Sequence, residues 1–178
     1  LAMEVAWVRG FTPVLKTTIY SFAAILATYL FSTLLGSQLY RRHLNRHKTI
    51  PTIKIIGTCY IFSLLPIFLG NPDTHPTTPI LLASILPLCM ALGYLTPNLI
   101  DQVSQGDPNE AGRAYAINIF GGILGPLLAG YFLIPQFGVK STLVLLSIPY
   151  GILFFNYIYS TEVSRVFKWT IGMTGTLG

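Results

Sequence analysis

The sequence has few charged residues: of its 178 residues only 10% are Asp, Glu, Lys or Arg, whereas 52% are hydrophobic. Soluble globular domains carry about 25% charged residues, so the composition excludes an ordinary soluble domain. Among the charged residues, six are acidic and eleven are basic, so the net charge is +5. This excess does not indicate nucleic-acid binding, because five basic residues cluster between Arg41 and Lys54, beside a hydrophobic run, where membrane topology accounts for them.

Sequence motifs of catalysis and metal binding are also missing. There is no G-x-G-x-x-G, phosphate loop, H-E-x-x-H or paired C-x-x-C. The two cysteines, Cys59 and Cys89, both fall in apolar runs, which favours small core residues over a disulfide or a metal pair. We therefore predict no catalytic residue, no metal site and no cofactor in these residues.

What the sequence does contain is a series of long uncharged runs. Charged residues leave five gaps, each close to or above the ~18 residues that a spanning helix needs: 17–40, 55–72, 74–100, 114–139 and 141–161. The fold class predicted is all-α, a polytopic transmembrane helix bundle of about five spanning helices plus the end of an earlier one. The spanning helices are expected at 17–40, 53–69, 80–100, 114–134 and 141–159.

The two ends of the chain differ from these helices. Residues 1–162 are expected to form one transmembrane domain, and residues 163–178 a cytoplasmic tail or truncated linker. The first nine residues, LAMEVAWVR, begin in mid-pattern and read as the end of an earlier helix. A short connection with Pro13 is expected at 11–16. From this start we expect the chain to be a fragment of a longer product.

Basic residues set the predicted topology. The loop after the first long helix carries Arg41, Arg42, Arg46 and Lys48. The positive-inside rule places that loop in the cytoplasm. Alternation then places 101–113 and 162–178 on the cytoplasmic side, and 70–79 and 135–140 outside.

The helix expected at 114–134 is rich in small residues. At four-residue spacing these form two adjacent stripes: Gly121, Gly125 and Ala129, and Gly122, Pro126 and Gly130. Such stripes allow close approach of another helix, so we predict that this is the most tightly packed helix. Pro126 removes a backbone N–H, which predicts a kink. Asn118 requires a polar partner within the bundle.

A few polar residues are candidate contacts for a solute. A cationic solute would need an acid or an aromatic face in the membrane, and the substrate-binding candidates are Glu4, Asn98, Asp101 and Asn118. Alternatively, Glu4 pairs with Arg9 and Asp101 with Arg113. We favour this pairing, which would leave no spare negative charge, and expect little independent polyamine transport. Capping of the 114–134 helix is expected from Asp107, Asn109 and Glu110.

Two resemblances follow from these segments. The run LLGSQLYRRHLNRHK resembles the second helix and basic loop in the first half of a major facilitator superfamily transporter. Gly121-x-x-x-Gly125-Pro126-x-x-Ala129-Gly130 is similar to the fifth-helix motif of its antiporters, with Ala129 where glycine is usual. The aspartate that often accompanies the basic residues is missing. This resemblance implies one six-helix half of a major facilitator fold.

The second resemblance covers nearly the whole chain. EVAWVRGFTPVLKTTIYSFAAILATYLFSTLLGS, ALGYLTPNLID and AGRAYAINIFGGILGPLLAGYFLIPQFG resemble the membrane domain of spermidine synthase-like fused proteins. In that family a major-facilitator-like region is often joined to a soluble aminopropyltransferase-like domain, which these residues do not contain. The resemblance implies an integral membrane domain of the bacterial inner membrane. It would act as a transport-like or anchoring module without catalysis of its own.

Two alternatives remain open at this point. The chain could be a structural accessory subunit that packs into a larger membrane complex through its small-residue faces. It could also be a fragment of an active polyamine aminopropyltransferase whose catalytic domain is absent here. The expected partners are the lipid bilayer, other transmembrane helices or subunits and, under the family resemblance, a soluble aminopropyltransferase-like domain. No nucleic-acid partner is expected.

Overall fold

The computed structural model describes residues 1–15, 18–48, 50–69 and 77–174, with side chains as far as Tyr159. These residues form helices joined by short connections, and they contain no strand. Within them, four stretches of helix are long and apolar enough to cross a membrane: Ile19–Asn45, Thr52–Leu69, Thr78–Ser104 and Pro108–Tyr159. The all-α class and the membrane character predicted from the sequence are confirmed.

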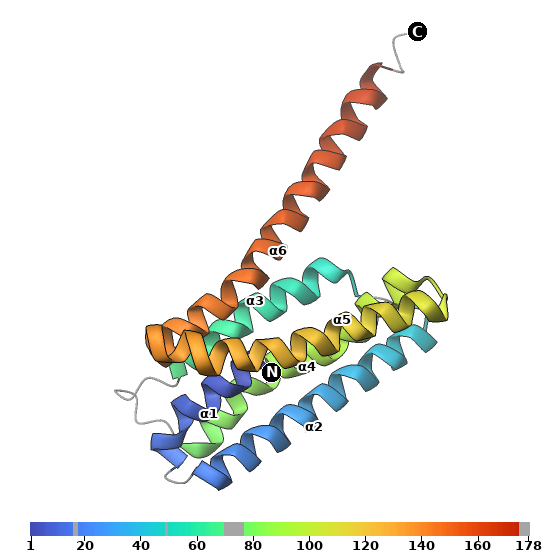
Figure 1. Cartoon of the computed structure of the whole chain (residues 1–178). Helices are drawn as coiled ribbons and strands as arrows, with labels where there is room; N and C mark the ends of the chain where they lie inside the picture. Colours follow the sequence, from blue (N-terminus) through green and yellow to red (C-terminus); the bar gives the residue numbers. More distant parts are fainter. Residues whose placement is uncertain (16–17, 49, 70–76, 175–178) are drawn as a thin grey trace.

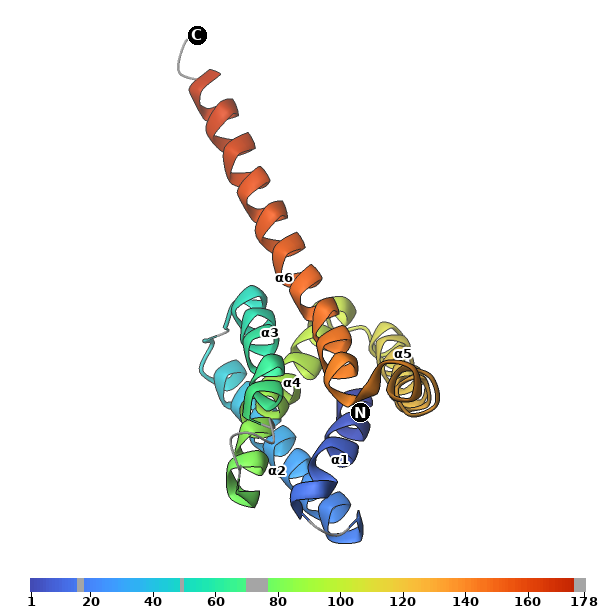
Figure 2. The same ribbon diagram turned by 90° about the vertical axis from the view of Figure 1, so that its left-hand side faces the viewer.

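The helices follow one another along the chain with short breaks. Their bounds are α1 Ala2–Leu15, α2 Thr18–Asn45, α3 Thr52–Leu69, α4 Thr78–Ser104, α5 Pro108–Leu127, the π-helix η2 Leu128–Leu133, and α6 Ile134–Thr174. Helix α4 is the centre of the bundle, with α2 against one side and α3 against another, and α1 is enclosed by α2, α5 and α6 (Figures 1 and 2). Consecutive helices alternate in direction, so the basic loop and the α4–α5 turn lie at the same end (Figure 1).

Both turns around α5 have an identifiable local cause. Helix α4 ends where Gln105 and Gly106 take positive φ angles of 47° and 93°, a conformation that stops a helix. Asp107 then caps α5: its carboxylate accepts the backbone N–H of Asn109 at 2.8 Å, and Pro108 occupies the first turn. At the other end, Gly138 has φ 74° and ψ 171°, a region nearly restricted to glycine. The helix therefore breaks at Gly138 and the chain reverses direction.

Shortly after Pro126 the chain changes from an α-helix to a π-helix. Because proline has no N–H, the carbonyl of Gly122 lacks its usual partner four residues on. Two residues later the backbone opens into the π-helix η2, which ends with the N–H of Ile134 bonded to the carbonyl of Ala129, five residues back. The irregularity expected at Pro126 is thus a widened helical turn.

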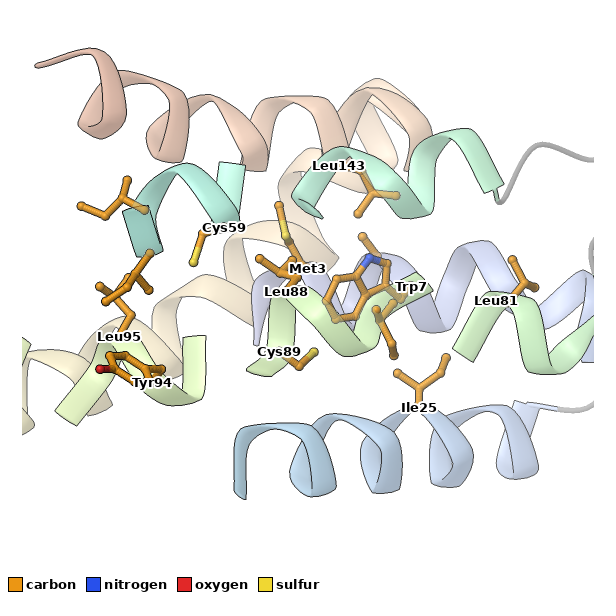
Figure 3. Close-up of a cluster of buried hydrophobic side chains, with 14 of the residues drawn as sticks. Met3, Trp7, Ile25, Cys59, Leu81, Leu88, Cys89, Tyr94, Leu95 and Leu143 are labelled. Carbon is orange, nitrogen blue, oxygen red and sulfur yellow. The ribbon is translucent and has the colours of Figure 1, made fainter. Parts of the chain in front are cut away.

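The buried core lies between α1, α2, α3, α4 and α6 (Figure 3). Trp7 of α1 is 2% exposed and is surrounded by apolar side chains, including Leu88 of α4 and Leu143 of α6. Its indole Nε1 is buried without a hydrogen-bond partner among the described residues. Cys59 and Cys89 are both buried and free, as small core residues. The core therefore depends on α1, the shortest of the α-helices.

The closest approach of a glycine to another helix lies between α2 and α4. A methyl group added at Gly93 would lie 2.7 Å from Cα of Thr33, and one at Gly36 would lie 2.9 Å from the backbone nitrogen of Tyr94. Real Cβ contacts are longer than this, so each glycine allows the opposite backbone to come near. The two glycines come from different helices and form no stripe in the sequence.

Helix α5 does not pack as predicted, because none of its side chains is buried. Gly121 faces open space, and the added methyl at Gly125 would lie at 3.3 Å from Cβ of Ala2, only slightly closer than ordinary contact. Of the same stripes, Ala129 is fully buried, and Gly130 lies beside Val5. The expectation that 114–134 is the most tightly packed helix of this chain is wrong, since most of its surface meets no other described helix.

Some helix boundaries also differ from the sequence-based ones. Residues 11–15 continue α1 through Pro13 instead of forming a connection, and α2 extends past Tyr40 to Asn45. Helix α6 continues to Thr174, so most of the expected tail 163–178 is helical and projects beyond the bundle (Figure 1). Residues 70–76 of the predicted outer loop lie outside the described residues.

Candidate functional site

A polar cluster lies at the basic end of the bundle, where α2, α3 and α4 meet. The hydroxyl of Tyr40 donates to a carboxylate oxygen of Asp101 at 2.6 Å. The hydroxyl of Tyr94 lies 3.2 Å from Nδ1 of His43 and accepts the backbone N–H of Ile50 at 3.4 Å. The rings of Tyr40 and Tyr94 meet edge to face at 5.2 Å. These contacts fix the end of α2 and the loop after it on α4.

A second part of the cluster joins the start of α3 to α4. The side-chain amides of Asn98 and Gln102 both donate to Oγ1 of Thr52, at 3.3 and 2.8 Å. Gln102 also donates to Oδ1 of Asn98 at 3.1 Å. Asn98 is buried, so this network satisfies polar atoms that would otherwise be costly in an apolar bundle. The sequence-predicted substrate residue Asn98 is thus a partner of Thr52 and Gln102, neither of which the sequence singled out.

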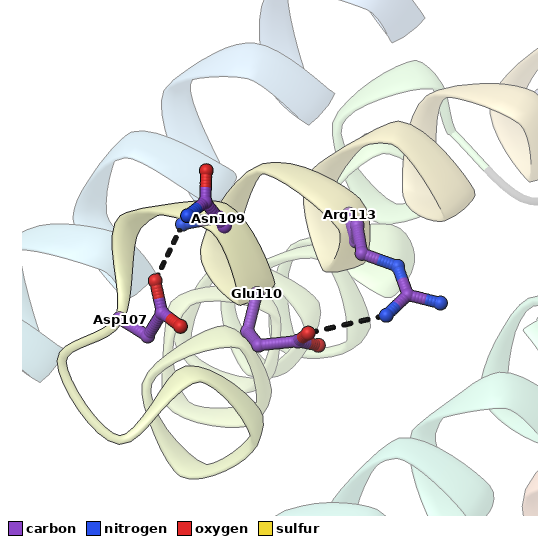
Figure 4. Close-up of polar contacts among 4 residues, drawn as sticks. All are labelled: Asp107, Asn109, Glu110 and Arg113. Atoms are coloured by element: carbon purple, nitrogen blue, oxygen red, sulfur yellow. Dashed lines mark hydrogen bonds and ion pairs between the residues drawn. The ribbon is translucent and has the colours of Figure 1, made fainter.

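The predicted pair of Asp101 with Arg113 is wrong. Arg113 instead forms an ion pair with Glu110, one turn earlier on α5, at 3.1 Å (Figure 4). Both groups are exposed, so the pair adds little stability. Asp107 caps α5 as expected. Asn109 takes part in this cap through its backbone N–H, which donates to Asp107, and the Glu110 side chain accepts from Arg113 (Figure 4). Asp101 belongs to the Tyr40 contact.

The predicted pair of Glu4 with Arg9 is also absent from the described part of the chain. Glu4 is 7% exposed, whereas Arg9 is exposed. Both line a pocket of about 420 Å³ between α1, α2 and α5, together with Phe22 and Pro126, yet no ion pair joins them. Glu4 therefore places an acidic side chain inside the bundle without an ion pair to Arg9.

Asn118 lies on another pocket, of about 400 Å³, formed by α2, α4 and α5. It is the eleventh residue of α5, about 15 Å along the helix, which is half of a ~30 Å hydrocarbon core. The pocket also contains hydroxyl side chains: Tyr29, Thr33, Ser37 and Thr96. Of the four predicted substrate residues, only Asn118 lines it, so the structure does not bring the four together.

The hydroxyls of this pocket have a defined polarity. Thr33 donates to the carbonyls of Tyr29 and Leu30 at 3.0 Å, Ser37 to that of Leu34 at 2.9 Å, and Thr96 to that of Leu92 at 3.0 Å. With their protons used in this way, the hydroxyl oxygens of Thr33, Ser37 and Thr96 are left as acceptors. Asn118 is the one amide on its wall. The pocket therefore offers acceptors from these three hydroxyls, and the hydroxyl of Tyr29 and the amide of Asn118 can also donate into it.

The basic loop is exposed at Arg41, Arg42, Arg46 and Lys48. Among the described residues, no three His, Cys, Asp or Glu side chains are placed to hold a metal ion together. The functional features of the chain are therefore the polar cluster, the two pockets and the distribution of charge.

Together, fold and composition define the class of this protein: an all-helical bundle with helices long and apolar enough to cross a membrane more than once. Comparison with known proteins does not narrow this class to a family. No protein-family model, curated protein or solved structure matches this chain.

Proposed function

We propose that this chain is an integral membrane domain of a spermidine synthase-like protein, built as one major-facilitator-like half with about five complete spans. It serves as a transport-like or anchoring module in the bacterial inner membrane and has no catalysis of its own. The observation that carries this proposal is the pattern of contacts between helices. Half-transporters of this kind consist of two three-helix repeats of opposite orientation, packed around a pseudo-twofold axis.

Such an axis would exchange α1 with α4, α2 with α5, and α3 with α6. The contacts between helices agree with this exchange. The exchange converts the α2–α4 contact into α5–α1, α3–α4 into α6–α1, and α1–α2 into α4–α5. It leaves α3–α6 and α1–α4 unchanged, and all of these contacts are present. Each exchanged pair also runs in opposite directions (Figure 1). An inverted repeat explains these features together, although the sequence shows no internal repeat.

The break at Gly138 supports the number of spans. The stretch Pro108–Tyr159 has 52 residues, which at 1.5 Å per residue would be about 78 Å of helix, far longer than a ~30 Å hydrocarbon core. Because the chain reverses at Gly138, this stretch supplies two antiparallel segments. Two antiparallel segments would return the chain after Tyr159 to the side of the basic loop.

Flux measurements on the chain in proteoliposomes test the proposal. In inverted-repeat transporters the solute site lies at the interface of the repeats and is enclosed by both halves. Here the face of α5 at Gly121 meets no other described helix, so we expect no saturable spermidine flux from the chain alone. Saturable flux that is lost in Glu4→Gln would contradict the half-transporter proposal, because the chain would then be a complete carrier with Glu4 as a solute ligand.

The open face of α5 favours a second candidate, an accessory subunit within a larger membrane complex. A methyl group added at Gly121 would meet no atom of another helix within 4 Å, and Ile117 of α5 and Tyr131 of η2 are 73% and 83% exposed. Native gel electrophoresis of mildly solubilised membranes would separate the candidates. A complex that Gly121→Leu reduces to the size of the single chain would support an accessory role, and a chain that runs alone in both forms would exclude it.

A further inference from the structure

A groove with a basic residue at one end runs between α2, α3 and α4. Its volume is about 370 Å³, and it is independent of the two pockets described above. Lys54, in the first turn of α3, stands at the basic end of the bundle. The rest of the wall is largely apolar, including Phe62 of α3 and Pro87, Met90 and Ala91 of α4.

The length of the groove follows from the register of its walls. Lys54, Thr58 and Phe62 are spaced four residues apart, so they lie along one face of α3. At 1.5 Å per residue, Lys54 and Phe62 are separated by about 12 Å along the axis. One leaflet of a bilayer contributes about half of a ~30 Å hydrocarbon core. The groove therefore extends from the headgroup level through most of one leaflet.

The charge at the mouth of the groove is predominantly positive, and the one acidic side chain of the neighbouring polar cluster, Asp101, accepts the hydroxyl of Tyr40. Lys54 is exposed, and the nearby basic loop adds Arg41, Arg42, Arg46 and Lys48. No acidic residue occurs in the sequence between Glu4 and Asp73. The ion pair found in the described part of the chain joins Arg113 to Glu110 and does not involve these residues.

We propose that this groove is a binding site for an anionic phospholipid, with one acyl chain between α3 and α4 and the phosphate on Lys54. The apolar wall matches an acyl chain, and the ammonium group matches a phosphate that carries net negative charge. A zwitterionic phospholipid would offer the same acyl chain without the net charge. The hydroxyl of Tyr94 is already bonded to His43 and Ile50, so the positive charge supplies the selectivity.

Native mass spectrometry of the whole chain, titrated with phosphatidylglycerol or phosphatidylcholine, tests the site. We expect one phosphatidylglycerol to be retained in preference to phosphatidylcholine. Lys54→Gln should weaken phosphatidylglycerol binding about fivefold, which corresponds to ~1 kcal/mol for one basic residue at an anionic surface, and should leave phosphatidylcholine unchanged. The matched control is Lys48→Gln, which removes the same charge from an exposed position outside the groove. Its effect should be less than about twofold.

A second variant tests where the acyl chain lies. Ala91→Leu adds bulk to the wall of the groove without changing charge, so it should lower the binding of both lipids. Equal losses for Lys48→Gln and Lys54→Gln would mean only a diffuse attraction to the basic surface and would overturn the proposal. So would equal retention of the two lipids by the parent chain, or undiminished binding by Ala91→Leu.

Discussion

Gly36→Ala tests the close contact between α2 and α4 most sharply. A methyl group at this position would lie 2.9 Å from the carbonyl carbon of Met90 and 2.9 Å from the backbone nitrogen of Tyr94. Both are backbone atoms of α4, so no side-chain rotation can relieve the overlap. The two helices would have to separate, and the contact that they make along their length would loosen.

The magnitude is best given against a matched control, Gly121→Ala. Both substitutions replace glycine with alanine inside a helix, which by itself favours the helix by about 1 kcal/mol. At Gly121 the methyl group enters open space, whereas at Gly36 it overpacks the interface, which costs ~1–3 kcal/mol. Gly36→Ala should therefore be less stable than Gly121→Ala by about 1–3 kcal/mol, because the helix-propensity gain cancels between them.

The assay is equilibrium unfolding in mixed micelles with increasing dodecyl sulfate, followed by circular dichroism. The free energy of unfolding should fall in Gly36→Ala, and Gly121→Ala should be at least as stable as the parent. If the two variants unfold together, or if Gly36→Ala is the more stable one, the close α2–α4 approach does not exist and the reasoning fails.

Three further predictions use the same unfolding assay. Thr52→Val removes the oxygen to which two amides of α4 donate, so it should lower the free energy of unfolding by about 1–3 kcal/mol; an unchanged value would contradict the network. Tyr40→Phe should cost about 1.5–3 kcal/mol, because its bond goes to the charged Asp101, and little in an Asp101→Ala background. Glu4→Gln and Arg9→Gln should be additive within about 0.5 kcal/mol, since no ion pair joins them.

Helix placement could be predicted from the sequence, because hydrophobic length is a local property. The expected helices at 53–69 and 80–100 correspond to Thr52–Leu69 and Thr78–Ser104. The helix predicted at 17–40 was ended too early, at the first basic residues. Helix α2 continues to Asn45, because basic residues are compatible with the last turn of a helix. Pro13 likewise did not end α1 where expected.

Partners could not be predicted in the same way. The small-residue stripes of α5 were visible in the sequence, but the tightest contact uses the single glycines Gly36 and Gly93, which meet only after folding. Asp101 was assigned to Arg113 by charge, whereas the fold brings it to Tyr40, 61 residues away. Sequence spacing reports which residues share a helical face, and it does not report what that face meets.

The candidate polar residues show the same limit. Asn98 was expected as a candidate contact for a solute, whereas in the structure Thr52 and Gln102 are its partners through the register of α3 against α4. Glu4 was expected to be neutralised nearby, and instead it is buried. Only an arrangement of whole helices could have shown this.

The central claim is that the chain is threaded through a membrane with its basic end in the cytoplasm. It is tested most directly by labelling single introduced cysteines in intact cells with a membrane-impermeant maleimide. Cys59 and Cys89 are buried and should stay silent. Gln136→Cys should react from outside, while His47→Cys and Asn109→Cys should react only after lysis, since all three positions are exposed at opposite ends of the bundle. Reaction of Asn109→Cys and Gln136→Cys from the same side would contradict the claim, because α5 would then not cross the membrane.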